Sequence, residues 1–200
     1  MAGGSFESQN KIRPGAYIKF QGVPSTDNIV GSRGIVTMAA PIGWGPEDEL
    51  IKVTVADLYS NKLEKILGFN VYSASAKLFK AALENAHTLL VYRADKGGTK
   101  ASVQIDVASN KKLKVTAKYA GTTGNNISIS IKEAFAGGYS VNTFLGSTQK
   151  DSQIVTDIKD LVANDFVTFE GEGEISQTAV NTLLTGGTNG VPNNQMYTEY

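Results

Sequence analysis

A loop of glycine, threonine and asparagine, GTTGNN at residues 121–126, is the stretch with the most obvious capacity for chemistry, because such loops can cradle a phosphate. A P-loop also needs a lysine followed by serine or threonine, between a buried strand and a helix. Here the lysine is absent, and an alternating polar and apolar strand follows. Gly121 and Gly124 allow a sharp turn, and Asn125 and Asn126 tolerate the same backbone region. The loop is therefore predicted to be a corner between two strands.

The other reactive side chains do not form a recognisable catalytic or metal-binding set. His87 is the only histidine and the chain has no cysteine, so a zinc site of the usual kind would lack a second ligand. The acidic clusters at 47–49 and 170–174 do not have the spacing of a calcium loop and are predicted to be solvated. Trp44, between two glycines, is predicted to lie against the core or at a subunit contact. The sequence thus predicts no enzyme, no cofactor and no metal.

Composition narrows the class of protein further. The 200 residues carry 19 basic and 19 acidic side chains, so charge gives no indication of a nucleic acid or an anionic membrane as partner. Without cysteine there can be no disulfide framework. The 41% hydrophobic content is sufficient for a globular core.

Residues 1–20 are predicted to form a polar arm that leads into a strand. The strand alternates, with one set of side chains on each face. It consists of Ala16, Tyr17, Ile18, Lys19 and Phe20.

The pattern of residues 21–94 is typical of an α/β protein. A strand is predicted at 34–40 and another at 88–94, with a short helix at 57–67 and a longer one at 73–87 between them. This order indicates a crossover connection and a parallel pair of strands.

After the glycine-rich stretch at 95–100 the pattern changes to alternating strands, as in a half-exposed antiparallel sheet. Three strands, a hairpin turn at 108–112 and a strand at 166–170 are predicted, together with helices at 151–164 and 176–184. The predicted fold class is α/β plus α+β. It comprises the extended arm (1–20), the first part of an incomplete α/β core body (21–94), an inserted α+β module (95–184) and a return to the core body (185–200).

Three motifs resemble the contractile tail sheath proteins of phages, and they occur in that family's order. They are NKIRPGAYIKF (10–20), AKYAGTTGNNISISI (117–131) and LLTGGTNG (183–190). The resemblance is closest to sheaths of Gram-positive phages and phage-tail-like bacteriocins. It implies an α/β core that lies against a tail tube, one outward-facing inserted module, and terminal arms that add strands to neighbouring subunits. Because such proteins continue well beyond this length, the chain is expected to be truncated at the carboxy end.

The function that this resemblance implies is structural. The expected role is a subunit of a contractile injection system, polymerising helically around a tube and contracting to drive it through a cell envelope. The implied partners are neighbouring sheath subunits, the tail tube protein, and baseplate and terminator proteins, with no nucleic acid and no membrane. The implied location is a virion tail or phage-tail-like particle, and the bacterial cytoplasm before release. The alternatives are a tube-like tail protein or, from the loop alone, a nucleotide-binding enzyme.

Overall fold

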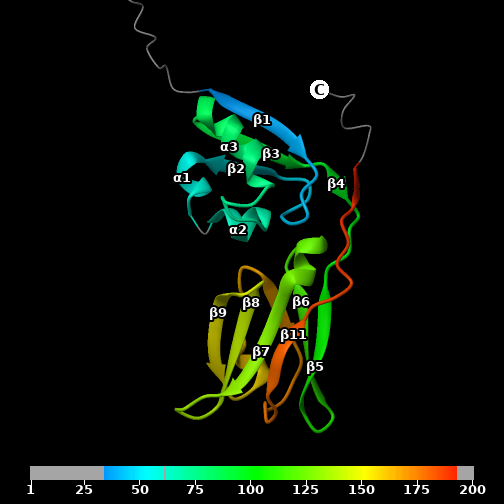
Figure 1. The fold of residues 1–200 in the computed structure, drawn as a ribbon. Helices are drawn as coiled ribbons and strands as arrows, with labels where there is room; N and C mark the ends of the chain where they lie inside the picture. The colour runs from blue at the N-terminus through cyan, green and yellow to red at the C-terminus, as the bar shows by residue number, and fades with distance from the viewer. Residues whose placement is uncertain (1–33, 61, 193–200) are drawn as a thin grey trace, which may run out of the picture. The chain divides into compact units, whose positions relative to one another are not determined.

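The computed structural model describes residues 34–60 and 62–192, whose helices and strands are drawn in Figure 1. The predicted arm strand, residues 16–20, lies outside the described residues. No helix in the described part of the chain is long and apolar enough to cross a membrane. Its helices are α1 (Val55–Leu58), α2 (Lys62–Leu67) and α3 (Ala76–Asn85); its strands are β1 (Ile35–Ala40), β2 (Leu50–Thr54), β3 (Thr88–Arg93), β4 (Asp95–Lys96), β5 (Ser102–Ala108), β6 (Lys111–Ala117), β7 (Ile127–Glu133), β8 (Tyr139–Leu145), β9 (Thr148–Val155), β10 (Val167–Glu170), β11 (Ala179–Leu183) and β12 (Val191–Pro192).

The first module is a three-stranded sheet in the order β1-β3-β2, with the helices following β2. The parallel pair predicted from the sequence is confirmed, because β1 and β3 pair in parallel from Ile35↔Thr88 to Ala40↔Arg93. Alternate residues of β3 and β2 face a core that the helices cover. The buried residues that form this core include Leu89, Val91, Ile51, Val53, Leu63, Leu67, Phe79 and Leu83.

Strand β2 and the break between α1 and α2 were not predicted. The sequence indicated one helix at 57–67, whereas the structure has two short helices directly after a strand. Thr54 ends β2 and caps α1: its hydroxyl accepts from the Asp57 N–H, and the Asp57 carboxylate accepts from the Thr54 N–H. This capping box allows the chain to change from strand to helix within one residue.

The second module is a β-sandwich, and both helices predicted in it are wrong. One sheet has the order β10-β6-β5 and the other β11-β7-β8-β9, and side chains of both fill one core. Residues 151–164 instead contain the end of β9 and a short 3-10 turn at Ile158–Asp160. Residues 176–184 contain β11, which pairs with β7. Apolar residues happened to recur at helical spacing, but pairing with neighbouring strands decided the structure.

The hairpin predicted around residues 108–112 is confirmed. Strands β5 and β6 pair antiparallel around a turn in which Asn110 has a positive φ of 64°. Asparagine is among the few residues that adopt this conformation readily.

The acid stability of the sandwich is expected to depend on Asp151. Burial alone raises the pKa of this carboxyl, but hydrogen bonds from Gln153, Asn164 and the Ser152 backbone outweigh burial and hold the pKa below 3.8. A depressed pKa contributes stability above the unfolded pKa, and this contribution is lost as pH falls through the folded pKa. Asp151→Asn should therefore flatten the fall in unfolding free energy below about pH 4. Urea titrations at several acidic pH values would measure this, with exposed Asp106→Asn as the matched control. An unchanged slope in Asp151→Asn would contradict the expectation.

Candidate functional site: the junction of the two modules

The GTTGNN loop forms a 3-10 turn at Thr122–Asn126 that leads directly into β7. Its predicted backbone is corrected in one respect. Of its two glycines and two asparagines, only Gly121 has a positive φ, at 135° with ψ at 163°. A β-carbon on Gly121 would lie 2.1 Å from the carbonyl oxygen of Gly43. Glycine is therefore required at position 121 for two reasons: its backbone conformation is rare for other residues, and the two modules approach too closely there for a β-carbon.

Three successive backbone donors of this loop, those of Thr122, Thr123 and Gly124, are already occupied. The Thr122 N–H donates to Asn189 Oδ1 at 2.8 Å. The Thr123 N–H donates to the Gly43 carbonyl at 3.3 Å, and the Gly124 N–H to the Gly121 carbonyl at 3.2 Å. A phosphate cradle needs such N–H groups to be free for the anion. The loop is organised to hold protein segments together.

Gly124, Asn125 and Asn126 each hold a different neighbour. A β-carbon on Gly124, which is buried, would lie 2.9 Å from that of Ala101. The Asn125 side chain donates to the Gly187 carbonyl and accepts from the Gly187 N–H, both at 2.8 Å. The Asn126 carbonyl accepts from the Gly146 N–H at 2.8 Å. The side-chain bridge of Asn125, and not a left-handed backbone, explains an asparagine at that position.

Trp44 extends from the first module into the core of the second. It is fully buried and belongs to the hydrophobic cluster of the sandwich. Its ring meets Tyr119 edge-on with centroids 5.3 Å apart, and stacks near Phe166 at 6.3 Å. Its Nε1–H donates to the Lys65 carbonyl at the end of α2, at 3.0 Å. The expectation that Trp44 lies against a core is confirmed, and the core is that of the sandwich.

A buried ion pair lies beside Trp44. Arg93 is fully buried at the end of β3, and its Nη2–H donates to Asp95 Oδ2 at 2.9 Å. Its Nη1–H donates to the carbonyls of Gly45 and Ala120, at 2.8 and 2.9 Å. Asp95 Oδ1 accepts from the Ile42 N–H at 2.8 Å. The ion pair thus joins three segments of the chain, at residues 42–45, 93–95 and 120, in one connected polar network.

Two side-chain ion pairs add to the junction. Glu64 on α2 pairs with Lys150 on β9, and both side chains are about six-sevenths buried. Lys65 pairs with Asp165 at 2.7 Å, and both are half exposed.

Burial, together with Glu49 and Asp165, raises the pKa of the Tyr119 hydroxyl beside Trp44. The phenol is therefore neutral at physiological pH.

The chain crosses between the modules twice, and the two crossings lie side by side. Strands β4 and β12 pair antiparallel, and further bridges join Thr99 to Thr188 and Ser102 to Thr185. β-Carbons on Gly98 and Gly190 would lie 2.4 and 2.1 Å from backbone atoms of the opposite crossing. These glycines allow two backbones to approach closely, so the glycine-rich stretch is a paired ribbon.

The remaining residues considered from the sequence lie elsewhere. His87 is exposed after α3, next to the Thr88 hydroxyl. Asp48 binds Lys96 and accepts from the Tyr92 hydroxyl at 3.0 Å, and these bonds lower its pKa. Glu170 pairs with Lys114 at 2.9 Å. Within residues 34–60 and 62–192, no three His, Cys, Asp or Glu side chains gather as a metal site would require.

Sequence reasoning missed Arg93, Asp95 and Asn189. The available signal was the run TLLVYRAD at 88–95, in which an arginine lies near the end of a strand predicted to be buried and an aspartate directly follows that strand. Charged residues in a buried strand are almost always paired, so this spacing could have indicated an internal ion pair.

Two protein-family models match the chain, one over each module. The model described as the phage tail sheath protein beta-sandwich domain matches residues 96–189. The model described as the tail sheath protein Gp18 domain III N-terminal region matches residues 33–94. The boundary between the two matches falls at the junction, between Arg93 and the paired crossings.

Individual proteins agree with these matches. The phage-like element PBSX protein XkdK of Bacillus subtilis (strain 168) is 31% identical, over 100% of this chain and 45% of its own length. The sheath tail protein of Desulfitobacterium hafniense has a TM-score of 0.72 and 34% identity, over 93% of this chain and 42% of its own. The sheath tail protein Lin1278 of Listeria innocua has a TM-score of 0.72 and 30% identity, over 84% and 37%.

The chain therefore belongs to the phage tail sheath protein family, as its three motifs predicted. It spans less than half the length of the relatives that it matches.

Proposed function

We propose that this protein is a structural subunit of a contractile tail sheath, which polymerises helically around a tail tube and contracts to drive the tube through a cell envelope. The observation that carries the proposal is the match of both modules to tail sheath domains, in order along one chain. The tube-like alternative is disfavoured, because a tube subunit would be a smaller β-barrel without the parallel β1–β3 pair and its helices.

For the domain organisation we propose the division expected from the sequence. Residues 21–94 begin the core body, residues 95–184 form the inserted outward-facing module, and residues 185–200 return to the core. The two separate hydrophobic clusters support this division. The membership of Trp44 in the sandwich cluster means that the inserted module needs one residue of the core body to complete its own core.

The sheet of the first module offers sites for neighbouring subunits. In the order β1-β3-β2, one edge of β1 and one edge of β2 have no strand partner among the described residues. Ile35 on β1 and Leu50 on β2 are 70% and 58% exposed. An extended arm such as residues 16–20 can add to such an edge through main-chain hydrogen bonds. Arms of this kind would keep subunits tethered while their bodies repack.

Helical symmetry would explain how the subunits form a tube, and stored strain would explain how the tube contracts. A head-to-tail contact whose rotation does not close produces an open helix, which is a tube. The extended sheath would be a kinetically trapped state, and contraction would release it without a nucleotide. The partners are neighbouring sheath subunits, the tail tube, and baseplate and terminator proteins, in a tail or bacteriocin-like particle of a Gram-positive host.

Removing residues 1–20 from the full-length gene product is expected to leave its fold intact and to abolish polymerisation. The strand pairs within residues 34–192 do not involve the arm, so the fold should survive its removal. In the proposed mechanism the arm pairs with the sheet of a neighbouring subunit, and this contact would be lost. Circular dichroism would report the fold, sedimentation the assembly, and negative-stain microscopy the striated tubes. The intact product, expressed together with the tube protein, is the control. Normal tubes without the arm would refute the tethering mechanism, and no tubes from the intact product would refute the sheath function.

A further inference from the structure

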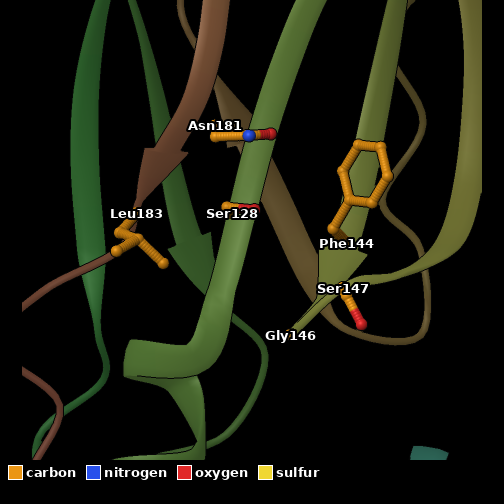
Figure 2. Close-up of a pocket in the computed structure, with 6 residues that line it drawn as sticks. All are labelled: Ser128, Phe144, Gly146, Ser147, Asn181 and Leu183. Carbon is orange, nitrogen blue, oxygen red and sulfur yellow. The ribbon is translucent and has the colours of Figure 1, made fainter.

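The four-stranded sheet of the sandwich carries a hollow of about 380 Å³ on the face away from the core (Figure 2). Ile127, Ile129 and Ile131 of β7 are fully buried in the core, so the alternate residues of β7 point to the opposite face. The hollow lies there. Its lining residues are Ser128, Phe144, Gly146, Ser147, Asn181 and Leu183.

A small residue between two larger ones creates the hollow. Ser128 pairs with Leu183 on β11 and with Phe144 on β8, so these three side chains form one row across the sheet. Figure 2 shows Leu183 and Asn181 on one side of β7, and Phe144 and Ser147 on the other. Ser128 is only 5% exposed and forms the floor between these walls.

Asn181 lies at the edge of the hollow with a left-handed backbone, which asparagine tolerates. Its φ is 45°, at an irregularity in the pairing of β11 with β7. The Asn181 N–H donates to Ser130 Oγ at 3.0 Å, and the Ser130 hydroxyl donates to Asn181 Oδ1 at 3.0 Å. These bonds fix the side-chain oxygen. The amide Nδ2 then has two N–H donors for which the described residues offer no hydrogen-bond partner. An N–H donor that is held in place and has no protein partner can donate to an oxygen atom of a ligand.

The chemistry of the lining selects the class of ligand. An aromatic ring and Leu183 offer apolar surface, whereas an amide and two hydroxyls offer hydrogen bonds. No charged side chain lines the hollow, so a phosphate or carboxylate would find no cation there. A pyranose sugar has both apolar C–H faces and hydroxyl groups, and the volume lies in the lower range of ligand pockets. We propose that this hollow binds an uncharged hexopyranose residue of a glycan.

In the bound state the sugar lies with one C–H face on the Phe144 ring. The Asn181 Nδ2–H groups donate to its hydroxyl oxygens, and Ser147 supplies a further hydroxyl contact. Because the hollow is open, the affinity for one sugar is weak, with a Kd of about 1 mM. This activity is separate from sheath assembly, and it would give the outer face of the inserted module a role in contact with surface polysaccharide.

The test is a titration of the ¹⁵N-labelled chain with D-glucose, N-acetylglucosamine and maltotriose, followed by amide chemical shifts. Saturable shifts are expected at Ser128, Phe144, Asn181 and Leu183, and glucuronate should bind more weakly than glucose. Saturable shifts that map elsewhere, no saturable shifts up to the solubility limit of the three sugars, or tighter binding of glucuronate would overturn the proposal.

Two variants sharpen the result. Asn181→Asp keeps the size, the oxygen acceptor and a residue tolerant of positive φ, but removes both N–H donors, and should weaken binding at least about tenfold. Phe144→Leu keeps an apolar wall without the ring and should weaken binding roughly tenfold. Phe135→Ala, at an exposed hairpin tip, is the control and should bind as the parent does. Unchanged affinity in the first two variants, with an intact spectrum, would refute the site and leave the sheath proposal unaffected.

Discussion

Replacing Arg93 by alanine is expected to destabilise the protein by about 3–5 kcal/mol, because it leaves the Asp95 carboxylate buried without its counter-ion. The Gly45 and Ala120 carbonyls lose their donor in the same step. Domains of ordinary size unfold with about 5–15 kcal/mol, so this loss is a large fraction of the total. The destabilisation should begin at the junction, since the guanidinium bridges both modules there.

The protein contains its own probe for this experiment. Trp44 is the only tryptophan and lies fully buried at the junction, so its fluorescence in a urea titration reports on that region directly. Lys159→Ala removes a charge whose side chain is 72% exposed and is the control, expected to change stability by less than about 0.5 kcal/mol. Asp95→Ala should also be strongly destabilising. The double variant should cost less than the sum of the two, because it removes the unpaired charge. A loss below about 1 kcal/mol in Arg93→Ala would show that the network does not hold the junction.

The sequence predicted the elements that repeat a simple pattern. The parallel β1–β3 pair and the β5–β6 hairpin were predicted from buried or alternating runs with clear breaks between them. It failed at residues 151–164, where Ile154, Ile158 and Leu161 recur at helical spacing. In the structure Ile154 is 63% exposed on β9 at the edge of its sheet, and Ile158 is buried from a 3-10 turn. Periodicity alone could not show that β8 was present to pair with this segment.

The junction was harder to predict because its contacts join residues far apart in the chain. The glycines of the corner loop were identified as turn residues, but the partner of Gly121 is Gly43, in a loop before β2. Arg93 meets the Ala120 carbonyl, 27 residues away. Asn189 accepts from Thr122 across 67 residues. A single sequence shows the backbone conformation that each residue prefers but not which distant residue it contacts. It therefore predicted the turn at 121–126 and missed the contacts of this turn with Gly43 and Asn189.

Gly121→Ala is expected to destabilise the protein by at least about 3 kcal/mol. The φ of 135° and ψ of 163° at this residue lie in a region that is essentially restricted to glycine, at a cost of about 1–3 kcal/mol for other residues. The new β-carbon would also lie 2.1 Å from the Gly43 oxygen. That oxygen accepts from the Thr123 N–H, so displacing it breaks a contact between the modules.

Gly137→Ala separates the cost of the backbone conformation from the cost of the clash with the Gly43 oxygen. Gly137 also has a positive φ, of 92°, but a β-carbon there would meet nothing within 4 Å. This variant should lose only the conformational part, about 1–2 kcal/mol. Urea unfolding followed by circular dichroism and by Trp44 fluorescence would measure both variants. Only Gly121→Ala should shift the emission of Trp44 in the folded state, because only it disturbs the loop that contacts Gly43. If both variants lose the same free energy and leave the emission unchanged, the close approach at Gly43 does not contribute to the attachment of the sandwich.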